Sequence, residues 1–129
     1  MNSGIILKML FMINYKFGDV VLVPFPFTDL TTTKNRPAVV VSSDRYNAEK
    51  NDVILSAITS QITSPIQNDE YLLTPVDLQL SGLLKPSIIK IGKIVTIDKR
   101  LIRKILGKIS NESLDVVEEK LINLLGKGA

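Results

Sequence analysis

Residues 18–42 constrain the fold more than any other stretch, because they read as a strand, a long polar loop and a second strand. The first apolar run, residues 18–23, is rich in valine and is followed by Pro24 and Pro26. Proline cannot donate to a sheet ladder, so we expect the two prolines to end the first strand or to mark it as an edge strand. The second run, residues 38–41, is too apolar to alternate, which predicts a strand buried on both faces.

The segment between these strands, residues 27–35, is rich in threonine and almost free of large apolar groups. Long polar loops held between buried strands often carry function. Arg36 stands where the loop enters the sheet, and Pro37 biases the backbone of Arg36 towards an extended conformation. A guanidinium on a stiff strand end beside a polar loop suits the binding of an anion.

Composition limits the chemistry that this chain can perform. A chain of 129 residues is expected to form one domain and to bury about two-thirds of its unfolded surface. The sequence has no Cys and no His, which excludes disulfides, cysteine nucleophiles and the commonest general base. Any reaction must therefore use Arg, Lys, Thr, Ser, Tyr or carboxylates.

The positive charges are spread unevenly. The formal net charge is +3, but residues 85–108 hold eight Lys or Arg against one acid, Asp98. Residues 112–119 hold four acids and no base. This asymmetry suggests an anionic partner, with nucleic acid the obvious candidate. Solvated strand and helix faces are the ordinary alternative, and for the charge run taken alone we favour it.

The N-terminal residues, MNSGIILKMLF, are apolar but too few to span a bilayer, and no small-residue cleavage site follows them. We interpret residues 1–14 as an extension, either disordered or arising from a start site upstream of Met12. Residues 15–129 are expected to form the single domain. We expect a cytoplasmic protein without membrane association.

The middle of the chain predicts short strands and turns. Residues 43–51 read as a polar connection with one helical turn, and residues 53–58, 70–74 and 87–97 as strands. Residues 75–86 predict an irregular crossing, with a turn of helix at 76–80 as the alternative. The period of two places Lys90 and Lys93 on opposite faces of their strand.

The C-terminal third contains one ambiguous segment and one clear helix. Asp98 is expected to cap a short turn, and residues 101–109 fit either a helix or a strand. Gly107 weakens a helix interior by about 1 kcal/mol relative to Ala, so we choose a strand at 104–109. Residues 111–125 predict a helix, with Ser110 as N-cap, Gly126 at the C′ position and an apolar stripe formed by Leu114, Val117, Leu121 and Leu124. Five or six short strands and a closing helix predict a small, mostly antiparallel barrel.

At GDVVLVPFPFTDLTTTKNRPAVVVS the chain resembles the PemK/MazF family of toxin endoribonucleases. The resemblance continues through DVILSAITSQI and GLLKPSIIKIGKIVTIDKRLIRKILGKIS and so covers residues 15–125. It implies an SH3-like barrel with a terminal helix, acting as a homodimer on single-stranded RNA without a metal or cofactor. In this family the ribose 2′-OH attacks the adjacent phosphate and leaves a 2′,3′-cyclic phosphate and a 5′-OH. The resemblance also implies a cognate antitoxin, whose disordered tail occupies the RNA groove.

Two positions that match the family motifs are expected to be catalytic: Arg36 of the RP pair and Thr59, which ends the AIT strand. Where relatives commonly have Gln before the TID segment, this chain has Lys93. The expected RNA contacts are Phe27, Thr28, Lys34, Asn35, Ser60, Gln61 and Lys93. Phe25 is expected to belong to the core, and Asp29 to a turn.

The residues agree with this reaction, because RNA supplies the 2′-OH nucleophile itself. Arg36 can bind a phosphate with two hydrogen bonds, and Thr59 can donate one more. A second hypothesis is a non-catalytic module on the same barrel that binds RNA or poisons a protein target, because one fold can host many functions.

Overall fold

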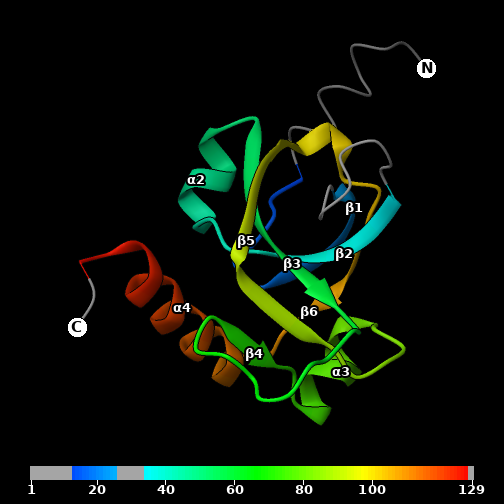
Figure 1. The fold of residues 1–129 in the computed structure, drawn as a ribbon. Helices are drawn as coiled ribbons and strands as arrows, with labels where there is room; N and C mark the ends of the chain where they lie inside the picture. Colours follow the sequence, from blue (N-terminus) through cyan, green and yellow to red (C-terminus); the bar gives the residue numbers. More distant parts are fainter. Residues whose placement is uncertain (1–12, 26–33, 128–129) are drawn as a thin grey trace.

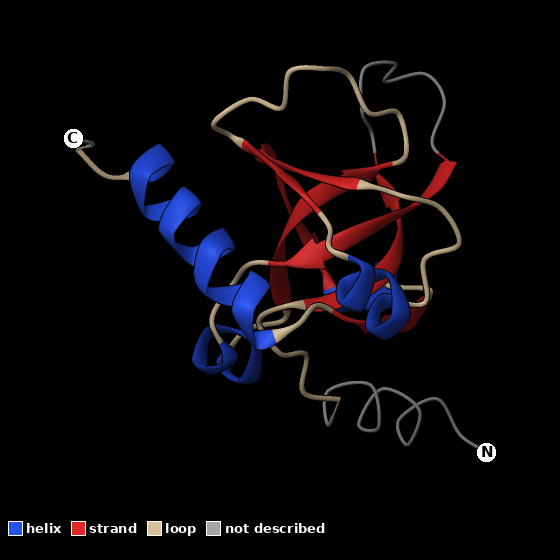
Figure 2. Cartoon of the chain, turned by 90° about the horizontal axis from the view of Figure 1, so that it is seen from below, coloured by secondary structure: helices blue, strands red, loops and turns tan. Residues whose placement is uncertain are grey.

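The computed structural model describes residues 13–25 and 34–127. In this part of the chain six strands form one antiparallel sheet in the order β4-β5-β3-β2-β1-β6. The sheet curls into a half-barrel, and the helices lie outside it (Figures 1 and 2). The prediction of a small antiparallel barrel with a closing helix is confirmed.

Strands β1 (Asp19–Phe25) and β2 (Lys34–Val40) are the two strands expected around the polar loop. β1 continues two residues beyond the predicted run of residues 18–23, because Pro24 pairs with Asn35 and the strand ends at Phe25. Strand β6 pairs with β1 only from Asp19 to Leu22, so Pro24 lies where β1 has lost one neighbour and the missing N–H costs little. Ala38 and the two residues after it are fully buried, as predicted.

Strands β3 (Asp52–Thr59) and β5 (Ile88–Asp98) form the longest pairing, and β5 bends sharply within it. Ser56 pairs with Ile94 whereas the next residue, Ala57, pairs with Lys90, so residues 91–93 bulge out of the ladder. The Ser56 hydroxyl donates to the Ile91 carbonyl across this bend (3.0 Å). A bulge breaks the period of two, so the alternation that was used to place Lys90 and Lys93 does not hold there.

The two short edge strands are β4 (Glu70–Leu72) and β6 (Lys104–Lys108). The ambiguity at residues 101–109 is thereby settled in favour of the strand. A 3-10 turn, η1 (Lys99–Leu101), precedes β6, and the Asp98 side chain caps it by accepting from the Arg100 N–H (2.8 Å).

Helix α2 (Asp44–Glu49) is the helical turn predicted within residues 43–51. Ser43 caps its start by accepting from the Tyr46 N–H (3.1 Å). Asn47 is fully buried, and its amide donates to the carbonyls of Tyr15 (3.0 Å) and Ser42 (3.1 Å). The helix is therefore tied to the segment that leads into β1.

Helix α3 (Pro75–Ser81) confirms the helical alternative at residues 76–80, so the irregular crossing predicted for residues 75–86 is wrong over most of its length. Its signal was present in the sequence, because Thr74 and Asp77 form a capping box around Pro75 at the first helical position. The helix ends at Gly82, which has a left-handed φ of 74°. At Gly107 an added Cβ would lie 2.1 Å from the Leu80 carbonyl oxygen, so the absence of a side chain lets α3 lie directly on β6.

Helix α4 (Asn111–Leu125) has the predicted bounds, and Ser110 caps it by accepting from the Ser113 N–H (3.2 Å). Within the predicted stripe Val117 and Leu121 are buried, whereas Leu124 is exposed. Gly126, expected at the C′ position, is the C-cap residue: its φ is −83°, and its N–H donates to the Ile122 carbonyl (2.8 Å).

The apolar core has two parts. One cluster includes Val21, Val23 and Leu55, together with Phe25, which was expected in the core. The other brings α4 against the sheet and comprises, among others, Val20, Val39, Ile89, Ile91, Val117 and Leu121. Within the described ranges no helix is long and apolar enough to cross a membrane.

Candidate active site

A cavity of about 530 Å³ opens where β2 begins and β3 ends. It is lined by residues of four strands, of the turn after β3 and of the segment between α3 and β5: Leu22, Arg36, Pro37, Ile58, Thr59, Ser60, Gln61, Gly82, Leu83, Leu84, Lys85, Ser87, Lys104 and Leu106. The two residues predicted to be catalytic, Arg36 and Thr59, thus lie in one cavity.

Strand register explains why Arg36 and Thr59 meet. The β2–β3 ladder pairs Ala38 with Ala57 and runs antiparallel. Arg36 precedes Ala38 by two residues and Thr59 follows Ala57 by two, so both lie just beyond the last pair of this ladder. The ladder therefore brings the start of β2 and the end of β3 to the same cavity. Both residues are half-buried.

The end of β3 is shaped by a local hydrogen bond. The Thr59 hydroxyl oxygen accepts from the Gln61 N–H at 3.1 Å, which turns the chain directly after the strand. The hydroxyl can still donate its own hydrogen to a ligand. This turn also brings Ser60 and Gln61, two of the predicted RNA contacts, to the cavity wall.

The cavity combines an apolar floor with a basic rim. Leu22, Ile58 and Leu106 supply apolar surface, whereas Arg36, Lys85 and Lys104 supply positive charge. No carboxylate lines the cavity within the described residues. A cavity wall whose charges are all positive concentrates the electric field in the cavity and attracts an anion.

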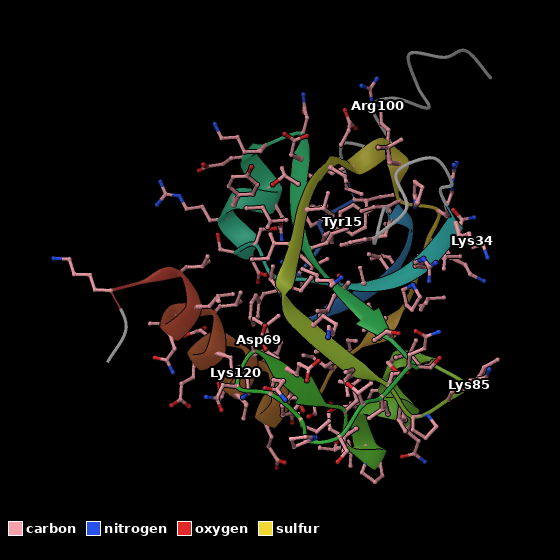
Figure 3. All side chains as sticks on the ribbon, viewed as in Figure 1. Tyr15, Lys34, Asp69, Lys85, Arg100 and Lys120 are labelled. Carbon is pink, nitrogen blue, oxygen red and sulfur yellow. The ribbon has the colours of Figure 1, made fainter. Side chains whose placement is uncertain are left out.

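Three other predicted contacts, Lys34, Asn35 and Lys93, are not among the residues that line the cavity. Lys34 and Asn35 are exposed and directly precede Arg36 on β2, whose first residue is labelled in Figure 3. Lys93 lies in the β5 bulge, away from the cavity wall. Phe27 and Thr28 fall outside the described residues, as does Asp29.

Two basic residues of the cavity were not singled out from the sequence: Lys85 and Lys104. Both belong to the basic run of residues 85–108, so the composition contained a signal. The composition could not show which of the eight basic residues line the cavity, because that depends on β6 pairing with β1 and on the path of the chain after α3.

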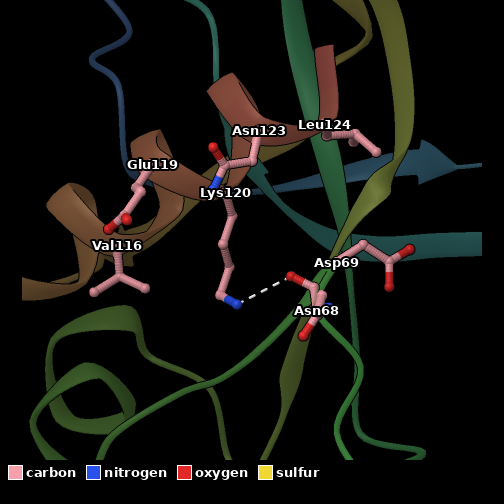
Figure 4. Close-up of a pocket in the computed structure, with 7 residues that line it drawn as sticks. All are labelled: Asn68, Asp69, Val116, Glu119, Lys120, Asn123 and Leu124. Atoms are coloured by element: carbon pink, nitrogen blue, oxygen red, sulfur yellow. Dashed lines mark hydrogen bonds between the residues drawn. The ribbon is translucent and has the colours of Figure 1, made fainter. Parts of the chain in front are cut away.

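A second cavity, of about 510 Å³, lies between α4 and residues 68–69 (Figure 4). The Lys120 ammonium crosses it and donates to the Asn68 carbonyl at 3.0 Å. The carboxylates of Asp69 and Glu119 also line it. This cavity holds none of the predicted site residues, and its mixed charge does not favour an anion.

The half-barrel, with a basic cavity at its strand ends, places the chain among the small β-barrel proteins. The comparison with known families is more specific. Residues 16–125 match the family of PemK-like, MazF-like toxins of type II toxin–antitoxin systems, and the chain belongs to this family.

Solved structures share the fold. An endoribonuclease from a mycobacterial species is 21% identical over 90% of this chain and 95% of its own, with a TM-score of 0.71. A mycobacterial endoribonuclease in complex with its cognate antitoxin is 20% identical, with a TM-score of 0.70 over 89% of this chain and 98% of its own. A MazE–MazF crystal structure from Deinococcus radiodurans is 24% identical over 88% of this chain and 98% of the other, with a TM-score of 0.68. At such identities the likeness establishes the fold that was expected from the resemblance.

Proposed function

We propose that this chain is an endoribonuclease toxin that cuts single-stranded RNA at the cavity holding Arg36 and Thr59. The observation that carries the proposal is the meeting of these two residues in one basic cavity of a PemK/MazF-family barrel. Structural neighbours described as endoribonucleases give further support.

The reaction assigned to the site is an intramolecular transesterification. The ribose 2′-oxygen bonds to the adjacent phosphorus and loses its proton, while the bond to the 5′-oxygen breaks and that oxygen gains a proton. The products are a 2′,3′-cyclic phosphate and a 5′-OH. No protein nucleophile and no metal is required by this chemistry, because the substrate carries the attacking group.

The two side chains have separate roles in this scheme. The Arg36 guanidinium binds the non-bridging phosphate oxygens and stabilises the negative charge that grows on them in the transition state. The Thr59 hydroxyl donates a hydrogen bond to the same phosphate group. Ser60 and Gln61, on the turn behind Thr59, contact the neighbouring nucleotide.

The test is cleavage of single-stranded RNA by the purified protein in the presence of EDTA. We expect products with 2′,3′-cyclic phosphate ends, and we expect Arg36→Ala to lower the cleavage rate by about 10²-fold or more. Arg103→Ala is the matched control, because it removes an exposed arginine that does not line the cavity. Intact RNA after incubation with the folded wild-type protein would contradict the proposal and favour the non-catalytic module.

The biological setting follows from the same assignment. Type II systems pair a toxin with a protein antitoxin, and one neighbour was solved with its cognate antitoxin. We therefore expect a cognate antitoxin for this chain, a homodimer as its active form and the cytoplasm, where its RNA substrate is found, as its location.

A further inference from the structure

Two lysines of the cavity come from different segments of the chain, Lys104 from β6 and Lys85 from the segment between α3 and β5. Lys104 begins β6 and pairs with Leu22 of β1, which in turn pairs with Pro37 of β2. A single cross-strand row therefore leads from Lys104 to the residue after Arg36. Neighbouring strands are about 4.8 Å apart, so the Lys104 backbone lies on the order of 10 Å from that of Pro37.

Lys85 reaches the cavity from the segment after α3. Gly82 begins this segment, and an added Cβ there would lie 2.6 Å from the Leu106 carbonyl oxygen, so the segment lies against β6. The Ser87 hydroxyl fixes its other end by donating to the Lys85 carbonyl at 2.9 Å. The Lys85 side chain is exposed and projects outwards (Figure 3).

Neither lysine has a carboxylate partner among the described residues, in contrast to Lys90, which pairs with Glu70, and Arg100, which pairs with Asp98. Both residues are exposed and line the cavity. A single scissile phosphate needs only Arg36 and one hydroxyl. Two further cations at a distance from that position indicate further negative charges on the same ligand.

We propose that Lys85 and Lys104 bind the phosphates that flank the scissile one, so that the RNA backbone is held at three points across the cavity. This inference rests on the proposed function, which places the scissile phosphate at Arg36 and Thr59. The phosphate contacts of the two lysines can be measured whether or not the RNA is cut. Contacts to phosphates hold the strand in register and carry no sequence preference.

The first experiment measures binding of a single-stranded 2′-deoxy oligonucleotide, which carries the phosphates but cannot be cut, at several salt concentrations. Each phosphate contact with a single strand contributes about 0.7 to the slope of log affinity against log salt. Lys104→Ala and Lys85→Ala are each expected to reduce this slope by about 0.7, and the double variant by about 1.4. Lys104→Arg should retain the wild-type slope.

Lys108→Ala is the matched control, because it removes a lysine of the same strand that pairs with Asp19 and does not line the cavity. Its slope should equal that of the wild type. Equal slopes for Lys104→Ala and the wild type would overturn the inference, even if RNA is still cut. A reduced slope in a protein that cuts no RNA would support it and refute the proposed function instead.

The second readout is cleavage kinetics. A contact that is made equally in the ground state and in the transition state changes KM and leaves kcat as it was. Lys104→Ala should therefore raise KM for RNA with little change in kcat, to the same extent for every RNA sequence that is cut. A fall in kcat at unchanged KM would place Lys104 in the chemical step and contradict the flanking-phosphate role.

Discussion

Thr59 is the residue whose role can be isolated most cleanly, because its hydroxyl and its shape can be changed separately. Thr59→Val keeps the branched side chain and removes the donor, so we expect kcat to fall by about 10²- to 10³-fold. Thr59→Ser keeps the hydroxyl, and with it the hydrogen bond from the Gln61 N–H, and should retain most of the activity. Single-turnover cleavage of a short RNA measures both.

The control for Thr59→Val is a comparison of its stability and its oligonucleotide binding with those of the wild type. Thr59→Val also removes an acceptor from the turn, so its thermal midpoint and its binding of the 2′-deoxy oligonucleotide should be compared with those of the wild type. If cleavage persists in Thr59→Val while the turn remains intact, the hydroxyl is not part of the chemical step.

At the scale of single residues, the sequence indicated two of the residues that line the cavity, but it did not indicate the other basic residues of the lining. Arg36 and Thr59 were predictable because both stand at strand ends within recognisable motifs. Lys85 and Lys104 were not, because nothing local to either residue distinguishes it from the other cations of the basic run. Lys93 shows the converse: its position was inferred from strand periodicity, and the bulge at residues 91–93 removes that periodicity.

The contact between α3 and β6 can be tested at Gly107. Gly107→Ala would place a Cβ 2.1 Å from the Leu80 carbonyl oxygen and within 3 Å of the Ser81 backbone, so the helix must move away from the strand. Overpacking of this kind costs about 1–3 kcal/mol, and here it acts on backbone, which yields little. We expect the free energy of unfolding to fall by about that amount in urea titrations.

Gly92→Ala is the comparison for this change. Its added Cβ would meet only the Asp69 carboxylate at 3.4 Å and the Leu124 side chain at 3.7 Å, both ends of flexible side chains. The free energy of unfolding should change by less than about 0.5 kcal/mol. Equal losses for the two variants would show that glycine itself, and not the close approach of α3, determines stability at these positions.

Strands were easier to predict than the crossing that became α3. Strands β2 and β3 could be predicted from their apolar composition, and helix α4 from its apolar stripe. Helix α3 has seven residues, too few for a clear apolar periodicity, and its signal lies in the Thr74–Asp77 capping box. A helix this short forms because it packs on β6, where Gly107 has no side chain to block it. This contact is tertiary and cannot be read from the local sequence.

For the whole molecule, one buried carboxylate links three elements. Asp77 is fully buried and accepts hydrogen bonds from the Thr74 N–H (3.0 Å), the Ser110 N–H (2.8 Å) and the Ser113 hydroxyl (2.5 Å). Ser113 also contacts the Tyr71 hydroxyl at 2.7 Å, so α3, α4 and β4 meet at this point. Burial alone would raise the pKa of Asp77, but the hydrogen bonds outweigh it and lower the pKa below the ordinary value.

This arrangement predicts a pH-dependent stability. Because the pKa of Asp77 is lower in the folded than in the unfolded chain, its contribution is full above the unfolded value of about 3.9 and is lost as the pH falls through the folded pKa. Asp77→Asn should lower the free energy of unfolding at pH 7 by about 2 kcal/mol. Urea titrations should show this difference from the wild type shrinking as the pH is lowered below about 4.

Asp115→Asn serves as the control, because it removes an exposed carboxylate from α4. Its free energy of unfolding should stay within about 0.5 kcal/mol of the wild type at pH 7. A difference between Asp77→Asn and the wild type that remains constant from neutral pH to pH 2 would mean that ionisation of Asp77 contributes nothing.

The pairing of β1 with β6 determines when, during synthesis of the chain, the site can form. The cavity draws residues from positions 22 to 106, and Lys104 is held by the β1–β6 ladder, so the site is incomplete until β6 has been made. Domains generally fold as units as the chain leaves the ribosome. A nascent chain still lacking β6 therefore carries no finished site, and its messenger can be translated almost to the end before the product becomes harmful.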